Sequence, residues 1–198
     1  AQMGKNALIV TGRNSSKKNG SLDDVINALK SKNIKYTVYD GVEENPSVET
    51  VMEAREIGVK AGCDFIIGIG GGSPMDAAKA IGVMIYHKNE NKDFLYKSVS
   101  NSQSLPVIEV PTTCGTGSEV TTVAVLTVHN EKTKKSMSHR IFPRMALVDE
   151  KYIKNAPLKV ICDTAIDALA HIVESCINNN ATEYSKMFAK EGLEAWSK

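Results

Sequence analysis

Three consecutive glycines, Gly70–Gly72, are the residues of this sequence best suited to hold a charged ligand. They follow an apolar run that predicts a buried strand over residues 64–69, and they precede a predicted helix. Without Cβ atoms, the backbone can approach a ligand closely. Ser73 can cap the helix, Pro74 suits its first turn, and Asp76 stands near the capping-box position. The free N–H groups of such a helix start favour a phosphate, whereas the alternative, a plain strand-to-helix turn, needs only one glycine.

A second segment, residues 111–119 with the sequence Pro-Thr-Thr-Cys-Gly-Thr-Gly-Ser-Glu, is dense in hydroxyl groups and glycine. It follows a predicted strand, and open α/β sheets bind ligands beyond the carboxyl ends of their strands. Thr112, Thr113 and Thr116 can therefore reach the same ligand as the glycine turn. Lys135 could neutralise a phosphate or bond a ribose, although the lysine-rich run around it also fits a solvated hairpin end.

The turn after the first predicted strand offers small polar and basic residues in place of the usual G-x-G-x-x-G fingerprint. Gly12 leaves room, and Asn14, Ser15 and Lys17 can donate hydrogen bonds to an anion. No acidic residue stands in this turn to bind ribose hydroxyls and repel a 2′-phosphate. The pattern therefore favours NADP over NAD, with a solvated turn as the alternative.

Asp167 and His171 are spaced i and i+4 in a predicted helix, so both side chains lie on one face. A carboxylate and an imidazole at this spacing can share a divalent metal ion. The wet face of an amphipathic helix is the alternative, since two ligands do not complete a zinc site. His139, Asp76 and Glu119 are candidates for a general base, but nothing distinguishes one of them, and no catalytic residue is assigned.

Strand-like and helix-like segments alternate in the first part of the chain, which predicts a Rossmann-like parallel sheet with helices on both faces. Strands are predicted over residues 6–11, 34–39, 64–69, 106–110 and 145–148, helices over 21–32, 47–61 and 74–86, and a hairpin over 123–128 and 134–138. Residues 87–105 are polar and irregular, which indicates a surface excursion. From Leu158 only helical patterns follow. We therefore expect an α/β dinucleotide-binding domain over residues 1–155 and the start of a helical metal-binding domain over 156–198.

Composition excludes several classes of partner. The formal net charge is +1, from 24 basic and 23 acidic residues, which argues against a nucleic-acid partner or a polybasic membrane surface. No apolar run approaches the roughly 18 residues of a spanning helix. The four cysteines show no C-x-x-C spacing and stand among apolar or small residues, which predicts reduced, buried thiols and a cytoplasmic location. The apolar residues of the last predicted helix have nothing visible to cover them, so we expect a piece of a longer protein or coverage by another chain.

The motifs at residues 70–76, 111–119 and 167–171, in this order, resemble those of the iron-containing (group III) alcohol dehydrogenases. That resemblance covers nearly the whole chain. It implies an N-terminal α/β domain that binds NAD(P), a C-terminal helical domain that holds Fe²⁺ or Zn²⁺, a small alcohol or aldehyde as substrate, and a homo-oligomer. A relative of the glycerol dehydrogenases or dehydroquinate synthases shares the fold, but the loop at 111–119 argues for the alcohol dehydrogenase branch.

The resemblance also implies roles for individual residues. Those implied to bind the dinucleotide are Gly12, Asn14, Ser15, Asn45, Gly71, Gly72, Ser73, Thr112, Thr113, Thr116 and Lys135. Asp167 and His171 match the first two metal ligands, and the other two are histidines much further along, which this chain lacks. NAD-specific members tend to carry Asp at the position of Gly12, so the resemblance also indicates NADP. We therefore expect a metal-dependent alcohol dehydrogenase as the whole protein, with a catalytically incomplete NADP-binding fragment as the alternative.

Overall fold

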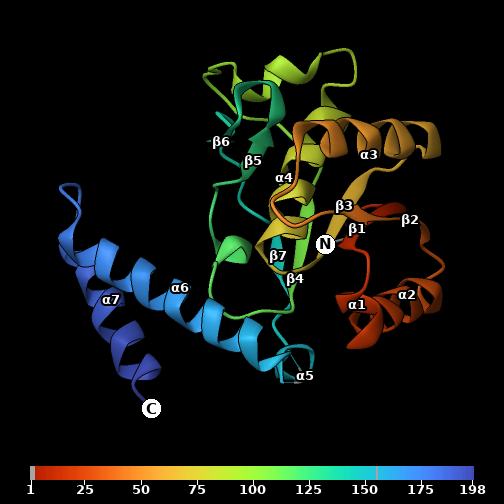
Figure 1. Ribbon diagram of the computed structural model, residues 1–198. Helices are drawn as coiled ribbons and strands as arrows, with labels where there is room; N and C mark the ends of the chain where they lie inside the picture. Colours follow the sequence, from red (N-terminus) through yellow and green to blue (C-terminus); the bar gives the residue numbers. More distant parts are fainter. Residues whose placement is uncertain (1–2, 155) are drawn as a thin grey trace.

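The computed structural model describes residues 3–154 and 156–198, and it contains a five-stranded parallel sheet between two layers of helices (Figure 1). The strand order is β2-β1-β3-β4-β7. The strands are β1 (Asn6–Gly12), β2 (Lys35–Val42), β3 (Phe65–Gly70), β4 (Val107–Pro111) and β7 (Met145–Ala146). The helices are α1 (Ser15–Lys18), α2 (Ser21–Ser31), α3 (Val48–Ala61), α4 (Gly72–Tyr86), α5 (Glu150–Ile153), α6 (Leu158–Ile177) and α7 (Glu183–Trp196). The predicted α/β class with a helix-flanked parallel sheet is confirmed.

The two faces of the sheet have separate hydrophobic cores because successive side chains of a strand point to opposite sides. Leu8 and Val10 of β1 join the core that contains α3 and α4, whereas Ala7 and Ile9 pack with Leu22 of α2 on the other side. Every residue of β3 is buried. This continuous burial is typical of a parallel strand covered on both faces, and it explains the uninterrupted apolar run in the sequence.

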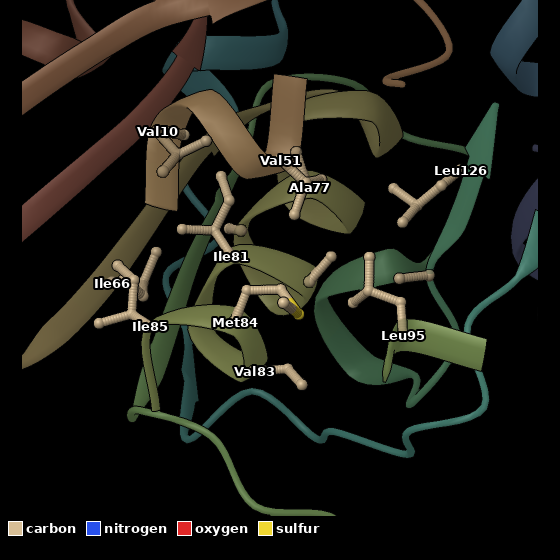
Figure 2. Close-up of a cluster of buried hydrophobic side chains, with 14 of the residues drawn as sticks. Val10, Val51, Ile66, Ala77, Ile81, Val83, Met84, Ile85, Leu95 and Leu126 are labelled. Atoms are coloured by element: carbon tan, nitrogen blue, oxygen red, sulfur yellow. The ribbon is translucent and has the colours of Figure 1, made fainter. Parts of the chain in front are cut away.

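Helix α4 crosses one face of the sheet, and most of its residues are buried. Figure 2 shows Ile81 and Met84 of this helix among Val10, Val51 and Leu126, which come from β1, α3 and the hairpin. Close packing on all these sides leaves little freedom for the helix to move. The start of α4, where the glycine turn lies, is therefore held in a fixed position relative to the sheet.

The predicted N-cap of α3 is confirmed. The Ser47 side chain accepts a hydrogen bond of 3.2 Å from the Thr50 amide, and Ser47 is 3% exposed. Replacing Ser47 with alanine is expected to lower the free energy of unfolding by about 1 kcal/mol, because a buried amide loses its partner. Urea denaturation of the S47A variant checks this value. The S31A variant is the control, since Ser31 lies at an exposed helix end and bonds only the Ala28 carbonyl; an equal loss in both would contradict the capping role.

The segment over residues 87–105 differs from the prediction of a surface excursion. It contains a short 3₁₀ helix, Lys92–Tyr96, whose Phe94 and Leu95 are buried in the core beside α4. A few apolar residues scattered through a polar run, among them Val99 and Leu105, were too weak a signal to indicate this packing. The predicted hairpin is confirmed as β5 (Val125–Val128) and β6 (Thr133–Ser136), which pair antiparallel.

Helices α6 and α7 lie side by side at the edge of the molecule (Figure 1). Trp196 of α7 donates a hydrogen bond of 2.8 Å to the Ala165 carbonyl of α6. Their large apolar side chains remain exposed, among them Ile166, Ile177, Tyr184 and Phe188. The predicted domain boundary near residue 155 lies outside the described residues and stays a prediction.

The cysteines differ in part from their prediction. All four are free thiols, but only Cys63 is buried, whereas Cys114, Cys162 and Cys176 are exposed. The apolar neighbours of Cys162 and Cys176 in the sequence lie on helix α6, whose faces are mostly uncovered. In the described part of the chain, no helix is long and apolar enough to cross a membrane.

Candidate functional site

The glycine turn connects the end of β3 to the start of α4. Gly70 has φ +148°, which L side chains rarely adopt, and Gly71 is the N-cap without a side-chain bond. A Cβ on Gly72 would lie 2.9 Å from Thr116 Cγ2, and one on Gly71 would lie 3.2 Å from Thr113 Oγ1. The glycines therefore allow the loop after β4 to approach the helix start, where the first amides have no partner within the helix.

Ser73 and Asp76 do not form the predicted capping arrangement. The Ser73 hydroxyl accepts a hydrogen bond of 3.0 Å from the Asn45 amide, and Asp76 accepts one of 2.6 Å from the Ser118 hydroxyl and one of 2.8 Å from the Val125 amide. Both side chains are thus used by segments far away in the sequence. The spacing of Ser73 and Asp76 suggested a cap, because the sequence around them carries no information about partners so far along the chain.

The loop after β4, residues 112–118, is held on α4 by a buried lysine that sequence reasoning missed. The Lys79 side chain is 0% exposed, and its ammonium donates to the Ser118 carbonyl at 2.6 Å, the Ser118 hydroxyl at 2.8 Å and the Val123 carbonyl at 2.8 Å. The sequence signal that could have pointed to it is a lysine inside an otherwise apolar helical pattern, since lysine is almost never fully buried unless it is paired. The threonines predicted to bind a ligand are therefore fixed beside the glycine turn.

The first-strand turn lies next to the same helix start. A Cβ on Gly12 would be 4.0 Å from Pro74 Cγ, and Asn14 and Ser15 are exposed at the start of α1. The acid that the sequence did not reveal comes from the end of β2: Asp40 accepts a hydrogen bond of 2.5 Å from Lys17. That lysine ammonium lowers the pKa of the Asp40 carboxyl. A carboxylate and an ammonium therefore stand together at the end of the second strand, where dinucleotide folds recognise the ribose.

Asn45 links this end of the sheet to the hairpin. It adopts a left-handed φ of 57°, and its side-chain oxygen accepts a hydrogen bond of 2.8 Å from Lys134. Lys135, the predicted ligand, instead pairs with Glu131 and lies 5.7 Å from the centre of the Tyr96 ring. Adjacent strand residues face opposite sides, so the structure brings Lys134 to Asn45 and Lys135 to the other face.

Asp167 and His171 lie on α6 and line one cleft with Gly72, Asp76 and the loop after β4. This cleft has a volume of about 850 Å³. His171 Nε2 is 3.6 Å from Asp167 Oδ1, and both side chains are about half exposed. Two ligands at about 2.1 Å from one tetrahedral ion lie about 3.4 Å apart, so the pair fits a shared metal ion. Within residues 3–154 and 156–198, no group of three or more such side chains is assembled.

The loop after β4 touches α6 directly. A Cβ on Gly115 would lie 2.4 Å from the Thr164 carbonyl oxygen, so only glycine permits this distance. Two of the predicted dinucleotide residues, Gly72 and Thr116, therefore line the same cleft as the predicted metal pair. Cys114, next to Gly115, is exposed.

The candidates for a general base lie in different places. Asp76 lines the cleft, where burial raises the pKa of its carboxyl. His139 is 1% exposed and bonds the Phe94 carbonyl at 2.9 Å, close to the His87 ring at the far end of α4. Because His139 lies about a helix length from the glycine turn, it does not fit the role. Glu119 is half-buried in the turn after the loop.

Known proteins similar to this chain point to one family. A family profile described as iron-containing alcohol dehydrogenase matches residues 1–150. A long-chain primary alcohol dehydrogenase of Thermoanaerobacter ethanolicus is 36% identical over 188 residues, which are 94% of this chain and 47% of that protein. The NADPH-dependent butanol dehydrogenase of Clostridium saccharobutylicum is 33% identical, over 96% of this chain and 50% of that protein.

A solved structure gives the same result. The crystal structure of an iron-containing alcohol dehydrogenase from Thermotoga maritima is 41% identical and superposes with a TM-score of 0.91, over 98% of this chain and 56% of that one. The chain spans about half the length of the curated relatives it matches.

Proposed function

The chain belongs to the iron-containing alcohol dehydrogenase family, and from this membership we propose that it forms the cofactor half of an enzyme that transfers hydride between NADP(H) and a small alcohol or aldehyde. The observation that carries the proposal is the shared cleft. Gly72 and the loop after β4 line one side of it, and Asp167 and His171 line the other. A dinucleotide bound on the first side would lie next to a metal ion bound on the second, as hydride transfer at a polarised C–O bond requires.

The chain's own residues divide into three roles in this proposal. The first amides of α4 and the hydroxyls of Thr113 and Thr116 bind the diphosphate. Asp167 and His171 hold a divalent metal, Fe²⁺ or Zn²⁺, which when bound supplies Lewis-acid polarisation of the substrate oxygen. Gly12 and the neighbouring Asn14 and Ser15 accommodate the adenosine ribose and its 2′-phosphate, and the Lys17 ammonium balances the charge of the nearby Asp40 carboxylate. A cytoplasmic location and a homo-oligomeric state are further parts of the proposal.

The preference for NADP over NAD has its own test, the Gly12→Asp variant. The position has room, since a Cβ there would lie 3.5 Å from the Val42 carbonyl oxygen. The NADPH dissociation constant is expected to rise at least about tenfold, because a carboxylate beside the 2′-phosphate is a like-charge contact. The NADH constant is expected to change less than about threefold. Fluorescence titration measures both.

The Asn89→Asp variant is the control for this test. It makes the same change in net charge in the exposed turn after α4, at the other end of that helix. Its two dissociation constants are expected to match those of the wild type. An equal weakening of NADPH and NADH binding by Gly12→Asp would contradict the proposed role of Gly12.

A second candidate function is cofactor binding without turnover by this 198-residue chain alone. The observation that favours it is the presence of only two assembled ligands in the described residues. Steady-state NADPH oxidation with butanal, with Fe²⁺ or Zn²⁺ added, distinguishes the two candidate functions. The assay is run on this chain and on the full-length protein. We expect turnover by the full-length protein only. Turnover by the 198-residue chain would contradict the need for further ligands.

A further inference from the structure

Glu109 is a buried acid that the proposed reaction does not use. It lies in β4, is 0% exposed, and neither of its carboxyl oxygens has a hydrogen-bond partner within the described residues. It pairs in register with Gly68 of β3. A Cβ on Gly68 would meet Ala78 of α4 at 2.8 Å, so this side of the sheet faces α4. The Glu109 carboxyl therefore lies beneath α4, on the face of the sheet where Gly68 lets the helix approach closely.

Lys79 is the buried cation on the helix above Glu109. An ammonium has three N–H donors, and all three of Lys79 are used by Ser118 and Val123. Asp76, whose Oδ1 is 3.9 Å from the Lys79 nitrogen, balances the charge. No donor of Lys79 is left for Glu109, which accounts for the unpartnered carboxyl. The contacts of Lys79 thus hold the 112–118 loop on α4 and provide no hydrogen bond to Glu109.

We propose that Lys79 is a positioning residue that holds the 112–118 loop for the dinucleotide, and that Glu109 competes for its ammonium once it loses its proton. The loop role rests on the proposed function, whereas the competition does not. An ionised carboxylate in this buried space attracts the ammonium strongly, because charges interact more strongly away from water. The ammonium then leaves the Ser118 and Val123 carbonyls, and the loop loosens from α4.

The charges around Glu109 favour its neutral form at neutral pH. The groups that act on it are Lys79 and Asp76 from α4 and Glu119 from the turn after the loop. The strands on either side offer Gly68 and Ala146, which carry no charge. Burial raises the pKa of Glu109 to about 9, and the two acids add to this shift while Lys79 opposes it. The 112–118 loop is therefore held on α4 at neutral pH and released from it at alkaline pH.

The test compares the wild type with the Glu109→Gln variant, which keeps the shape and cannot ionise. Both carry the Cys114→Ser change, which removes the exposed thiol from the loop. Hydrogen exchange of residues 112–125 is measured in the full-length protein without cofactor from pH 7 to pH 10, after correction for intrinsic exchange. Exchange in the wild type is expected to accelerate about tenfold between pH 7 and pH 8 and to level off above pH 9, since the ionised fraction of a carboxyl rises about tenfold per pH unit only below its pKa. The Glu109→Gln variant is expected to change less than about threefold.

NADPH titration over the same pH range is the second arm. The wild type is expected to lose affinity about tenfold in alkali, and Glu109→Gln is expected to keep it. The Lys79→Met variant is expected to exchange rapidly at all pH values, and the exposed Glu56→Gln variant, the control, is expected to follow the wild type. The same alkaline loss in Glu109→Gln, or no loss in the wild type, would overturn the proposal. Absence of NADPH binding at pH 7 with the expected exchange pattern would instead overturn the proposed function and leave the competition intact.

Discussion

Replacing His171 with alanine is expected to lower the turnover of the full-length protein about a thousandfold. His171 and Asp167 form the proposed metal pair in the cleft, with 3.6 Å between Nε2 and Oδ1. Loss of one ligand weakens metal binding, and the polarisation that a bound metal supplies amounts to several kcal/mol. About 4 kcal/mol corresponds to about a thousandfold in rate. Steady-state oxidation of NADPH with butanal measures the loss, and metal analysis of the purified variant measures the ion content.

The control for this result is the His129→Ala variant. His129 is exposed at the tip of the hairpin and does not line the cleft. Its turnover and metal content are expected to equal those of the wild type. NADPH is expected to bind His171→Ala within about twofold of the wild type, because the dinucleotide contacts lie on other elements. Full turnover by His171→Ala would show that this side chain is no ligand.

The Gly115→Ala variant has the second largest expected effect, about a hundredfold loss of turnover with the fold retained. An alanine Cβ would lie 2.4 Å from the Thr164 carbonyl oxygen, which belongs to the backbone of α6 and cannot rotate away. The loop after β4 and α6 must therefore separate. A displacement of about 1 Å between reacting groups costs about a hundredfold in rate. Steady-state kinetics with saturating NADPH measures the change.

A matched control distinguishes displacement from lost stability. Gly82 is tightly packed on the other half of α4, where a Cβ would lie 3.2 Å from Val107 Cγ2. Gly82→Ala is expected to alter the melting temperature without changing turnover at 25 °C. Equal activity in Gly115→Ala and the wild type would mean that the contact between the loop and α6 does not set the geometry of the site.

The sequence predicts features that depend on neighbouring residues. The strand, glycine turn and helix of residues 64–86 follow from local pattern, and so does the Ser47 cap. Asp76 shows the limit of prediction from local pattern, because its partners Ser118 and Val125 lie 42 and 49 residues away along the chain. A local capping position cannot compete with two long-range hydrogen bonds to a half-buried carboxylate.

The lysines of the hairpin show a second limit. A shift of one residue reverses the face of a strand, and the exact turn at residues 129–132 decides which lysine faces Asn45. The structure places Lys134 there, while Lys135, the lysine that the sequence suggested as a dinucleotide ligand, pairs with Glu131. Lys17 of α1 meets Asp40 of β2 because β1 and β2 are neighbours in the sheet, a pairing that becomes visible only when the sheet order is known.

The dissociation constant of NADPH for the Gly72→Val variant, compared with the wild type, tests the glycine turn most directly. A Cβ at this position would lie 2.9 Å from Thr116 Cγ2, and a valine would fill the space proposed for the diphosphate. We expect saturable binding of one NADPH per chain to the wild type, and an affinity at least about tenfold lower for Gly72→Val. Equal affinity in the two proteins, or a wild type that does not bind NADPH, would show that the turn between β3 and α4 is not a dinucleotide site.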